Sequence, residues 1–169
     1  MQVVLGKQTE SMSADEVIAL TSRYQQVMID LGTGDGKFAL ALAREQPRAL
    51  IIGLDPVSEA MMEVAGRARR KRTSQKNLLF VVGSVEQPPI ELCGIADQLY
   101  VVLPWGSLMR GIILGEEWVL GGIAGLLRPG GEVTILLNER IYLEPSPAEA
   151  QGLPQLTEAY INDTLAGRM

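Results

Sequence analysis

Five short, mostly apolar runs, separated by segments with helical patterns, constrain the fold more than any other feature of this sequence. They lie at residues 27–31, 49–54, 78–82, 98–103 and 132–137. Their apolar residues are continuous rather than alternating, which indicates strands that are buried on both faces. Strands of this kind that alternate with helices predict an α/β fold, a doubly wound and mostly parallel sheet with right-handed crossovers.

The segments around these runs predict helices and one hairpin. Apolar residues at helical spacing predict helices over 38–44, from 58 to about 71, and over 116–127. A capping-box pattern, Ser13 with Glu16, predicts a helix over 15–23. Before it, residues 3–5 and 8–10 are expected to pair as a short hairpin.

Composition excludes several classes of chemistry. The 169 residues include no histidine and one cysteine, Cys93. Histidine-based acid–base catalysis, Ser-His-Asp hydrolysis and histidine-ligated metal sites are therefore excluded, and one thiol cannot build a thiolate metal site. We expect no metal. The sequence has no apolar stretch long enough for a membrane span and no signal-peptide pattern, so we expect a cytoplasmic protein with no membrane partner.

A glycine-rich stretch, VMIDLGTGDG at residues 27–36, directly follows the first of the predicted buried strands. In a doubly wound sheet, ligands bind beyond the carboxyl ends of the strands, where the strand order reverses. Gly32, Gly34 and Gly36 would let the backbone approach a ligand closely, and the following helix offers unpaired N–H groups. The alternative is an ordinary strand-to-helix turn whose glycines serve packing.

The spacing of the glycines narrows the choice of ligand. A dinucleotide fingerprint, G-x-G-x-x-G, would need glycine at Lys37. The Asp30 carboxylate suits a cationic group and would repel a pyrophosphate, and Asp55 can take two ribose hydroxyls. Asp55 alone could also be a helix N-cap ahead of Pro56. A ligand with ribose hydroxyls, a positive charge and no phosphate is S-adenosylmethionine.

Five motifs in the order IDLGTGDG, GLDP, GSVEQPP, LPWG and LRPGG resemble the class I S-adenosylmethionine-dependent methyltransferases. More narrowly, VMIDLGTGDGK together with LPWGSLMRG resembles the family that methylates N1 of adenosine 1408 in the decoding site of 16S rRNA and confers aminoglycoside resistance. The resemblance implies S-adenosylmethionine as cofactor and the small ribosomal subunit as partner. The alternatives are a class I methyltransferase for tRNA or a small molecule, and a truncated cofactor- or RNA-binding module without activity.

The resemblance also implies roles for individual residues. The expected cofactor contacts are Asp30, Gly32, Thr33, Gly34, Asp55, Pro56, Val85, Glu86, Leu103 and Ser107. Trp105, which follows Pro104 at the carboxyl end of a strand, would stack on the target base, whereas a core tryptophan is the alternative. Adenine N1 carries a free lone pair, so no general base is required. Packing within a helix is the default explanation for Trp118.

A basic cluster indicates where RNA would bind. The net charge of −5 does not indicate a nucleic-acid partner by itself. However, the segment RARRKRTSQK concentrates Arg67, Arg69, Arg70, Lys71, Arg72 and Lys76 at the end of a predicted helix. We interpret this cluster as a phosphate-contacting patch, and a solvated helix end that complements the helix dipole is the alternative. Arg110 is expected to add to the RNA side near Trp105.

The sequence departs from the family pattern after the fifth strand. We expect one domain, with a hairpin at 1–12, a cofactor-binding core at 13–138 and a C-terminal extension at 139–169 that lacks the final strand pair of the fold. In that extension the pattern predicts a helix over 156–166. The strand at 132–137 would then be an exposed sheet edge, which favours self-association.

Overall fold

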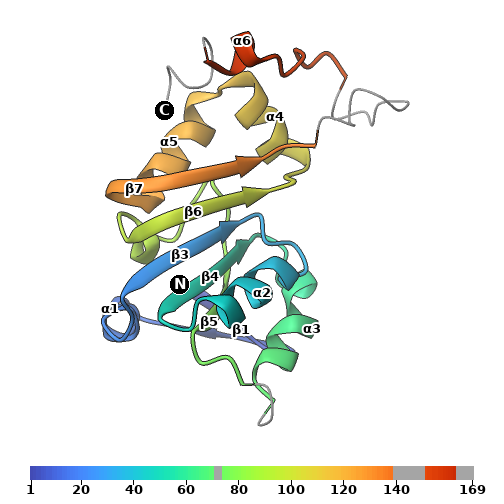
Figure 1. Ribbon diagram of the computed structural model, residues 1–169. Coiled ribbons are helices and arrows are strands. Elements are labelled where there is room, and N and C mark those ends of the chain that lie inside the picture. Colours follow the sequence, from blue (N-terminus) through green and yellow to red (C-terminus); the bar gives the residue numbers. More distant parts are fainter. Residues whose placement is uncertain (71–73, 139–150, 163–169) are drawn as a thin grey trace.

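A seven-stranded sheet organises the protein, whose computed structural model describes residues 1–70, 74–138 and 151–162. Its order is β2-β1-β5-β4-β3-β6-β7 (Figure 1). The strands are β1 (Gln2–Leu5), β2 (Gln8–Ser11), β3 (Gln26–Leu31), β4 (Ala49–Asp55), β5 (Leu78–Val82), β6 (Ala96–Val102) and β7 (Leu127–Leu136). Strands β3 to β7 pair in parallel, while β1 is antiparallel to both β2 and β5. The predicted doubly wound, mostly parallel α/β fold is therefore confirmed.

Helices cover both faces of this sheet. They are α1 (Ala14–Thr21), α2 (Lys37–Glu45), α3 (Ser58–Ala68), α4 (Gly106–Leu114), α5 (Glu117–Leu126) and the short α6 (Glu158–Tyr160), with a 3-10 turn, η1, at Ile90–Leu92. Buried residues of α2 and α3 pack on one face, and those of α4, α5 and η1 pack on the other. None of the helices in the described ranges is long and apolar enough to cross a membrane.

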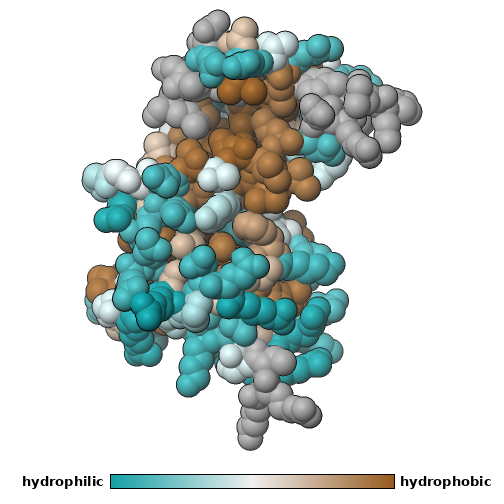
Figure 2. All heavy atoms as spheres, in the orientation of Figure 1, coloured by the Kyte–Doolittle hydropathy of each residue, from teal (hydrophilic) through white to brown (hydrophobic). Residues whose placement is uncertain are grey.

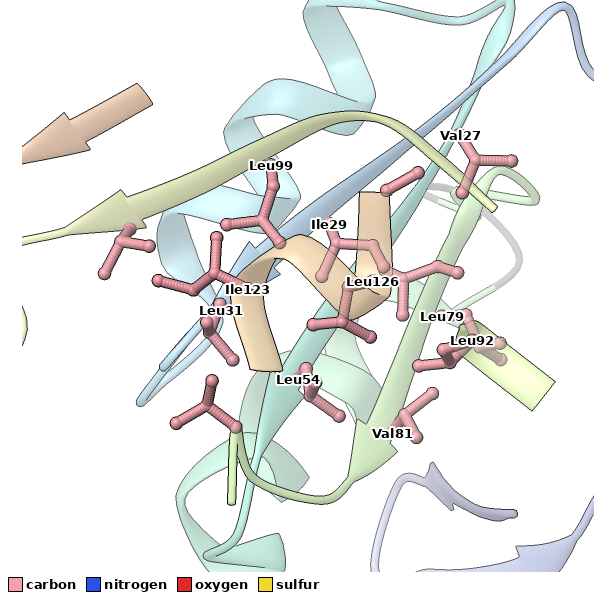
Figure 3. Packing of buried hydrophobic residues seen from close by; sticks show 14 of the residues in the cluster. Val27, Ile29, Leu31, Leu54, Leu79, Val81, Leu92, Leu99, Ile123 and Leu126 are labelled. Atoms are coloured by element: carbon pink, nitrogen blue, oxygen red, sulfur yellow. The ribbon is translucent and has the colours of Figure 1, made fainter. Parts of the chain in front are cut away.

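Successive residues of the central strands enter opposite cores. Ile29 of β3 and Ile52 of β4 pack with Ile123 of α5, as Figure 3 shows for Ile29 and Ile123. Their neighbours Met28 and Ile51 join the core formed with α2 and α3. Because both faces of β3 and β4 are covered, most of their residue positions are apolar. This burial accounts for the continuous apolar runs in the sequence.

Most element boundaries agree with the sequence pattern. The hairpin pairs as β1 and β2, and β5 has the predicted bounds. At the start of α1, the Ser13 N–H donates to the Glu16 carboxylate at 2.8 Å, and the Glu16 N–H donates to the Ser13 hydroxyl at 3.3 Å. This reciprocal capping box is the one that the sequence predicts. Helix α3 ends at Ala68, before the expected limit near residue 71, which lies outside the described residues.

The second half of the chain departs from the predicted elements in four places. Strand β6 ends at Val102 because Leu103 has a φ of +50°, which breaks the extended backbone. Helix α4 was not expected from the sequence, and β7 begins at Leu127 rather than at residue 132. In the predicted helix over 156–166, the structure places α6 at Glu158–Tyr160, and residues 163–166 lie outside the described ranges.

The order of the strands places the end of β3 at a switch point. From β3 the chain adds β4 and then β5 on one side, and it then returns to add β6 and β7 on the other side. The connections after β3 and β6 therefore diverge, which leaves room beyond the carboxyl ends of these strands. The glycine-rich stretch begins at this place.

Asn77 stabilises the connection between α2 and β4. Its side chain is 6% exposed, and its amide nitrogen lies 2.9, 3.1 and 3.0 Å from the carbonyl oxygens of Ala43, Gln46 and Ala49. These carbonyls belong to the end of the helix and the start of the strand. The Gln46 carbonyl also accepts the Ala49 N–H at 3.1 Å, so the main contribution of the Asn77 amide is to supply a donor to the buried carbonyls of Ala43 and Ala49.

Replacement of Asn77 by alanine is expected to lower the free energy of unfolding by about 2 kcal/mol, because buried carbonyls would lose their donor. Denaturant unfolding measures this change, with Asn162→Ala at an exposed asparagine as the matched control. A loss below about 0.5 kcal/mol, the range of ordinary surface substitutions, would contradict the role of Asn77.

Candidate functional site

A pocket of about 270 Å³ lies beyond the carboxyl ends of β3, β4, β5 and β6. Its walls come from the connections that follow these four strands and from the start of α4. The lining residues are Leu31, Gly32, Gly34, Leu54, Asp55, Pro56, Gly83, Ser84, Val85, Glu86, Leu103, Pro104, Trp105, Ser107 and Leu108. The crevice predicted at the reversal of strand order is therefore present, and it gathers residues that lie far apart in the sequence.

The three glycines after β3 serve different purposes. Gly32, Gly34 and Gly36 have φ values of +74°, +54° and +76°, a region that other residues rarely adopt. A side chain at Gly36 would collide with the Phe80 ring, so this glycine serves packing. A Cβ atom at Gly34 would meet nothing within 4 Å, so the backbone at Gly34 is open to the pocket.

Asp55 connects the glycine loop to the turn after β4. Its Oδ2 atom accepts the Gly34 N–H at 2.9 Å, and its Oδ1 atom accepts the Val57 N–H at 2.9 Å. The N-cap residue of α3 is Val57 rather than Asp55. The carboxylate is thus held at both oxygens by backbone groups. Each oxygen has a further lone pair with which it can accept a ligand hydroxyl.

Asp30 and Thr33 lie behind the glycine loop rather than among the lining residues of the pocket. They are 2% and 8% exposed, and the Thr33 hydroxyl donates to the Asp30 carboxylate. Burial raises the pKa of Asp30 to about 6; hydrogen bonds from Thr33 and from the Ala39 backbone oppose the rise, and the charge of Asp55 adds to it. A cation bound nearby would favour the charged form of Asp30.

Glu86 faces the pocket as a carboxylate. The Ser107 hydroxyl donates to its Oε1 atom at 3.2 Å. Hydrogen bonds from Ser84 and, to a lesser extent, from Ser107 keep the pKa of Glu86 below its usual range, so it is ionised at neutral pH. Ser84 was not predicted, although its place in GSVE directly after β5 is a usable signal.

The charge of the lining residues restricts the ligand. The pocket wall contains two carboxylates, Asp55 and Glu86, and no lysine or arginine is among the lining residues. An acidic wall of this kind favours a ligand with positive charge and disfavours phosphate groups. The glycine backbone, the Asp55 oxygens and the acidic wall therefore fit S-adenosylmethionine better than a dinucleotide.

The segment Leu103–Gly106 forms the rim of the pocket in an uncommon conformation. Leu103 and Gly106 have φ values of +50° and +60°. For leucine this conformation costs about 1–2 kcal/mol. The Leu103 N–H donates to the Leu136 carbonyl at 2.8 Å, which holds the turn against β7. Leu103 and Gly106, both with a left-handed backbone conformation, therefore flank the Pro104–Trp105 pair at the start of α4.

Trp105 lies at the surface rather than in the core. Its side chain is 57% exposed and lines the pocket, so the alternative of a core tryptophan is wrong. Leu108, one turn further along α4, also lines the pocket and was not predicted. Trp118 at the start of α5 is 41% exposed, so packing explains only part of its surroundings.

The basic residues expected to contact RNA fall into three groups. Arg67, Arg69, Arg70 and Lys76 are exposed around the end of α3. Lys71 and Arg72 lie outside the described residues. Arg110 on α4 donates from Nη1 to the Gln151 carbonyl at 3.3 Å, so it contacts the C-terminal segment. The RNA-binding role of these residues stays a prediction.

Comparison with known proteins identifies one family. The family described as "NpmA: 16S rRNA (adenine(1408)-N(1))-methyltransferase" matches residues 2–169. The 16S rRNA (adenine(1408)-N(1))-methyltransferase of Streptoalloteichus tenebrarius is 34% identical, over 99% of this chain and 78% of its own. The Escherichia coli protein of the same name is 30% identical, over 95% of this chain and 74% of its own.

Solved structures give the same result. A crystal structure of a variant 16S rRNA (adenine(1408)-N(1))-methyltransferase from Catenulisporales acidiphilia, determined with its cosubstrate SAM, has a TM-score of 0.95 and 36% identity, over 99% of this chain and 83% of its own. The antibiotic-resistance methyltransferase Kmr has a TM-score of 0.89 and 40% identity, over 99% of this chain and 80% of its own.

The pKa of Asp30 predicts a pH dependence of stability without ligand. Its pKa is raised from 3.8 to about 6 on folding, so the protonated acid is favoured by the fold. The contribution of Asp30 is therefore present below its unfolded pKa and is lost as pH rises through about 6. The denaturant midpoint of the wild type should therefore fall as the pH rises from about 4 to 7, and in Asp30→Asn this fall should be smaller. An equal slope in the variant and the wild type would contradict the assignment.

Proposed function

This chain belongs to the 16S rRNA (adenine(1408)-N(1))-methyltransferase family, and on that premise we propose that it transfers a methyl group from S-adenosylmethionine to N1 of adenosine 1408 in 16S rRNA. The single observation that carries the proposal is the acidic, glycine-lined pocket with an exposed tryptophan on its rim. The expected consequence for a cell is aminoglycoside resistance.

The residues present can hold the cofactor. The backbone at Gly32 and Gly34 would face its amino acid portion, and the Asp55 carboxylate would accept its ribose hydroxyls. Pro56, Val85, Glu86, Leu103 and Ser107 would complete the walls around the adenosine and methionine ends. Asp30 and Thr33 would act from behind the loop, where the buried charge of Asp30 favours a cation. Bound S-adenosylmethionine supplies a methyl group already activated by its sulfonium.

The protein has to position the acceptor rather than activate it. Adenine N1 has a free lone pair at neutral pH, so no side chain must remove a proton before attack. Trp105 would stack on the extracted base and replace part of the stacking that the base loses, on the order of 1–3 kcal/mol. Positioning alone can contribute roughly 7–11 kcal/mol to a reaction of this kind. A sequence without histidine is consistent with such a mechanism.

The partner implied by this activity is the small ribosomal subunit. Exposed Arg67, Arg69, Arg70 and Lys76 support a docking surface for rRNA phosphates at the end of α3, to which Lys71 and Arg72 would add. Arg110 would contribute from α4, the helix whose N-cap residue is Trp105. A ribosomal substrate supports a place in the cytoplasm.

We also propose that the protein self-associates through β7. Among the described residues, β7 pairs with β6 alone. A hollow of about 700 Å³ lies beside it, and Glu117 is the charged residue among its apolar and glycine lining. In Figure 2 the hydrophobic surface gathers in the part of the molecule that contains α4, α5 and β7. An unpaired edge next to apolar surface favours pairing with a second copy.

Sedimentation over a range of protein concentrations tests this association. A dimer is expected at high concentration, and Thr134→Lys, which adds charge at an exposed position of β7, should remain a monomer. A wild-type protein that stays monomeric throughout would contradict the proposal.

Transfer of labelled methyl groups to isolated small ribosomal subunits tests the function. We expect incorporation into 16S rRNA and a primer-extension stop at adenosine 1408, because N1 methylation blocks base pairing. A stop at another nucleotide, or transfer to tRNA instead, would reject the proposed substrate while retaining the methyltransferase activity.

Two variants separate the roles within this assay. Asp55→Asn should weaken S-adenosylmethionine binding, since it removes the charge that accepts the ribose hydroxyls. Trp105→Ala should leave that affinity unchanged and lower turnover by about tenfold or more, as expected for the loss of one stacked base. Trp118→Ala, at the other exposed tryptophan, is the matched control. Unchanged turnover in Trp105→Ala would contradict the stacking role.

A further inference from the structure

The direction of the Trp105 ring depends on the backbone that carries it. With 57% of its side chain exposed, Trp105 receives little support from packing. It is the N-cap residue of α4, and its carbonyl accepts the Met109 N–H at 3.4 Å, a long hydrogen bond. The orientation of α4 therefore decides where the ring lies.

Helix α4 is held on two sides. On one side Ile112 packs into the main core beneath the sheet. On the other side Met109 and Ile113 are buried by Leu137, Leu153 and Leu156. Two of these three covering residues belong to the described segment 151–162, so this segment forms much of the outer support of α4.

Tyr160 ties that segment to the end of α4. Its hydroxyl donates to the Ile113 carbonyl at 2.6 Å. Ile113 lies in the last turn of the helix, where a carbonyl has no helical N–H partner. The Tyr160 backbone is itself fixed, because its N–H donates to the Thr157 hydroxyl at 3.1 Å. At the other end of the segment, the Arg110 guanidinium donates to the Gln151 carbonyl.

We infer that Tyr160 is a positioning residue for methyl transfer, which acts by holding the last turn of α4 so that its first turn presents Trp105 and Ser107 to the pocket. The inference rests on the proposed function. Tyr160 is not among the lining residues of the pocket, so it acts through the helix. Because α4 is short and rigid, a change at its last turn alters the direction of its first turn.

Tyr160→Phe tests the inference with the loss of a single hydroxyl. With saturating ribosomal subunits, kcat should fall about tenfold, since small misplacement of reacting groups lowers rates strongly. The KM for subunits should stay within about twofold, because the basic residues at the end of α3 do not belong to α4. Any loss of affinity for S-adenosylmethionine should be smaller than the loss of kcat, because Ser107 and Leu108 are the residues of α4 among the many that line the pocket.

Tyr24→Phe is the matched control. The Tyr24 hydroxyl also donates to a backbone carbonyl distant in sequence, that of Lys76 at 2.8 Å, which does not belong to α4. This variant should lose similar thermal stability and keep kcat. The inference is overturned if Tyr160→Phe retains the wild-type kcat, or if Tyr24→Phe lowers kcat to the same extent.

A second measurement does not depend on the methyl-transfer activity. The sequence has two tryptophans, so Trp118→Phe leaves Trp105 as the sole fluorophore of this kind. In that background, Tyr160→Phe should lower the fluorescence anisotropy of Trp105, and Tyr24→Phe should not. Unchanged anisotropy in Tyr160→Phe overturns the inference even if the protein methylates 16S rRNA. Lowered anisotropy in a protein that transfers no methyl group upholds the positioning role and rejects the proposed function.

Discussion

Burial of β3 and β4 on both faces is the constraint from which the site follows. Their side chains enter two cores, so the strands themselves offer no surface for polar chemistry. Polar and flexible residues are therefore placed at the strand ends, where the glycine loop and Asp55 meet. The hydrogen bond from Gly34 to Asp55 joins the turns after two neighbouring strands, so the same carboxylate shapes the pocket and faces its ligand.

The sequence predicted the sheet well because its continuous apolar runs directly reflect the burial of the strands on both faces. It also placed the pocket, because ligands of a doubly wound sheet bind beyond the carboxyl ends of its strands, where the glycine-rich turn lies. It missed α4, which begins after Pro104 and contains Gly106 and Gly111, residues that normally interrupt helices. Its start depends on the left-handed turn at Leu103, which is held by a hydrogen bond to Leu136. Such a contact between residues that lie far apart in the sequence has no local signal.

Asp30 shows a second limit of motif reasoning. The motif correctly marked an acid at the end of β3, but it could not show on which side of the strand the carboxylate lies. The side-chain alternation of β3 directs Asp30 away from the core that contains Ile29 and Leu31, toward the start of α2, where Thr33 and the Ala39 backbone receive it. An acid can thus influence a bound cation through the field of its charge without standing in the wall of the site.

The Phe80 ring explains part of the glycine pattern in terms unrelated to any ligand. A Cβ atom at Gly36 would lie 2.5 Å from this ring, and one at Gly53 would lie 2.7 Å from it. One aromatic residue on β5 therefore forbids side chains at two positions of other segments. In a homologue with a small aliphatic residue at this place, the obstruction by the ring would be removed at both positions, while the Thr33 methyl group, at 3.0 Å, would still crowd a Cβ atom at Gly53. The number of glycines in such a motif therefore depends on the size of a neighbouring core residue as well as on the binding of a cofactor.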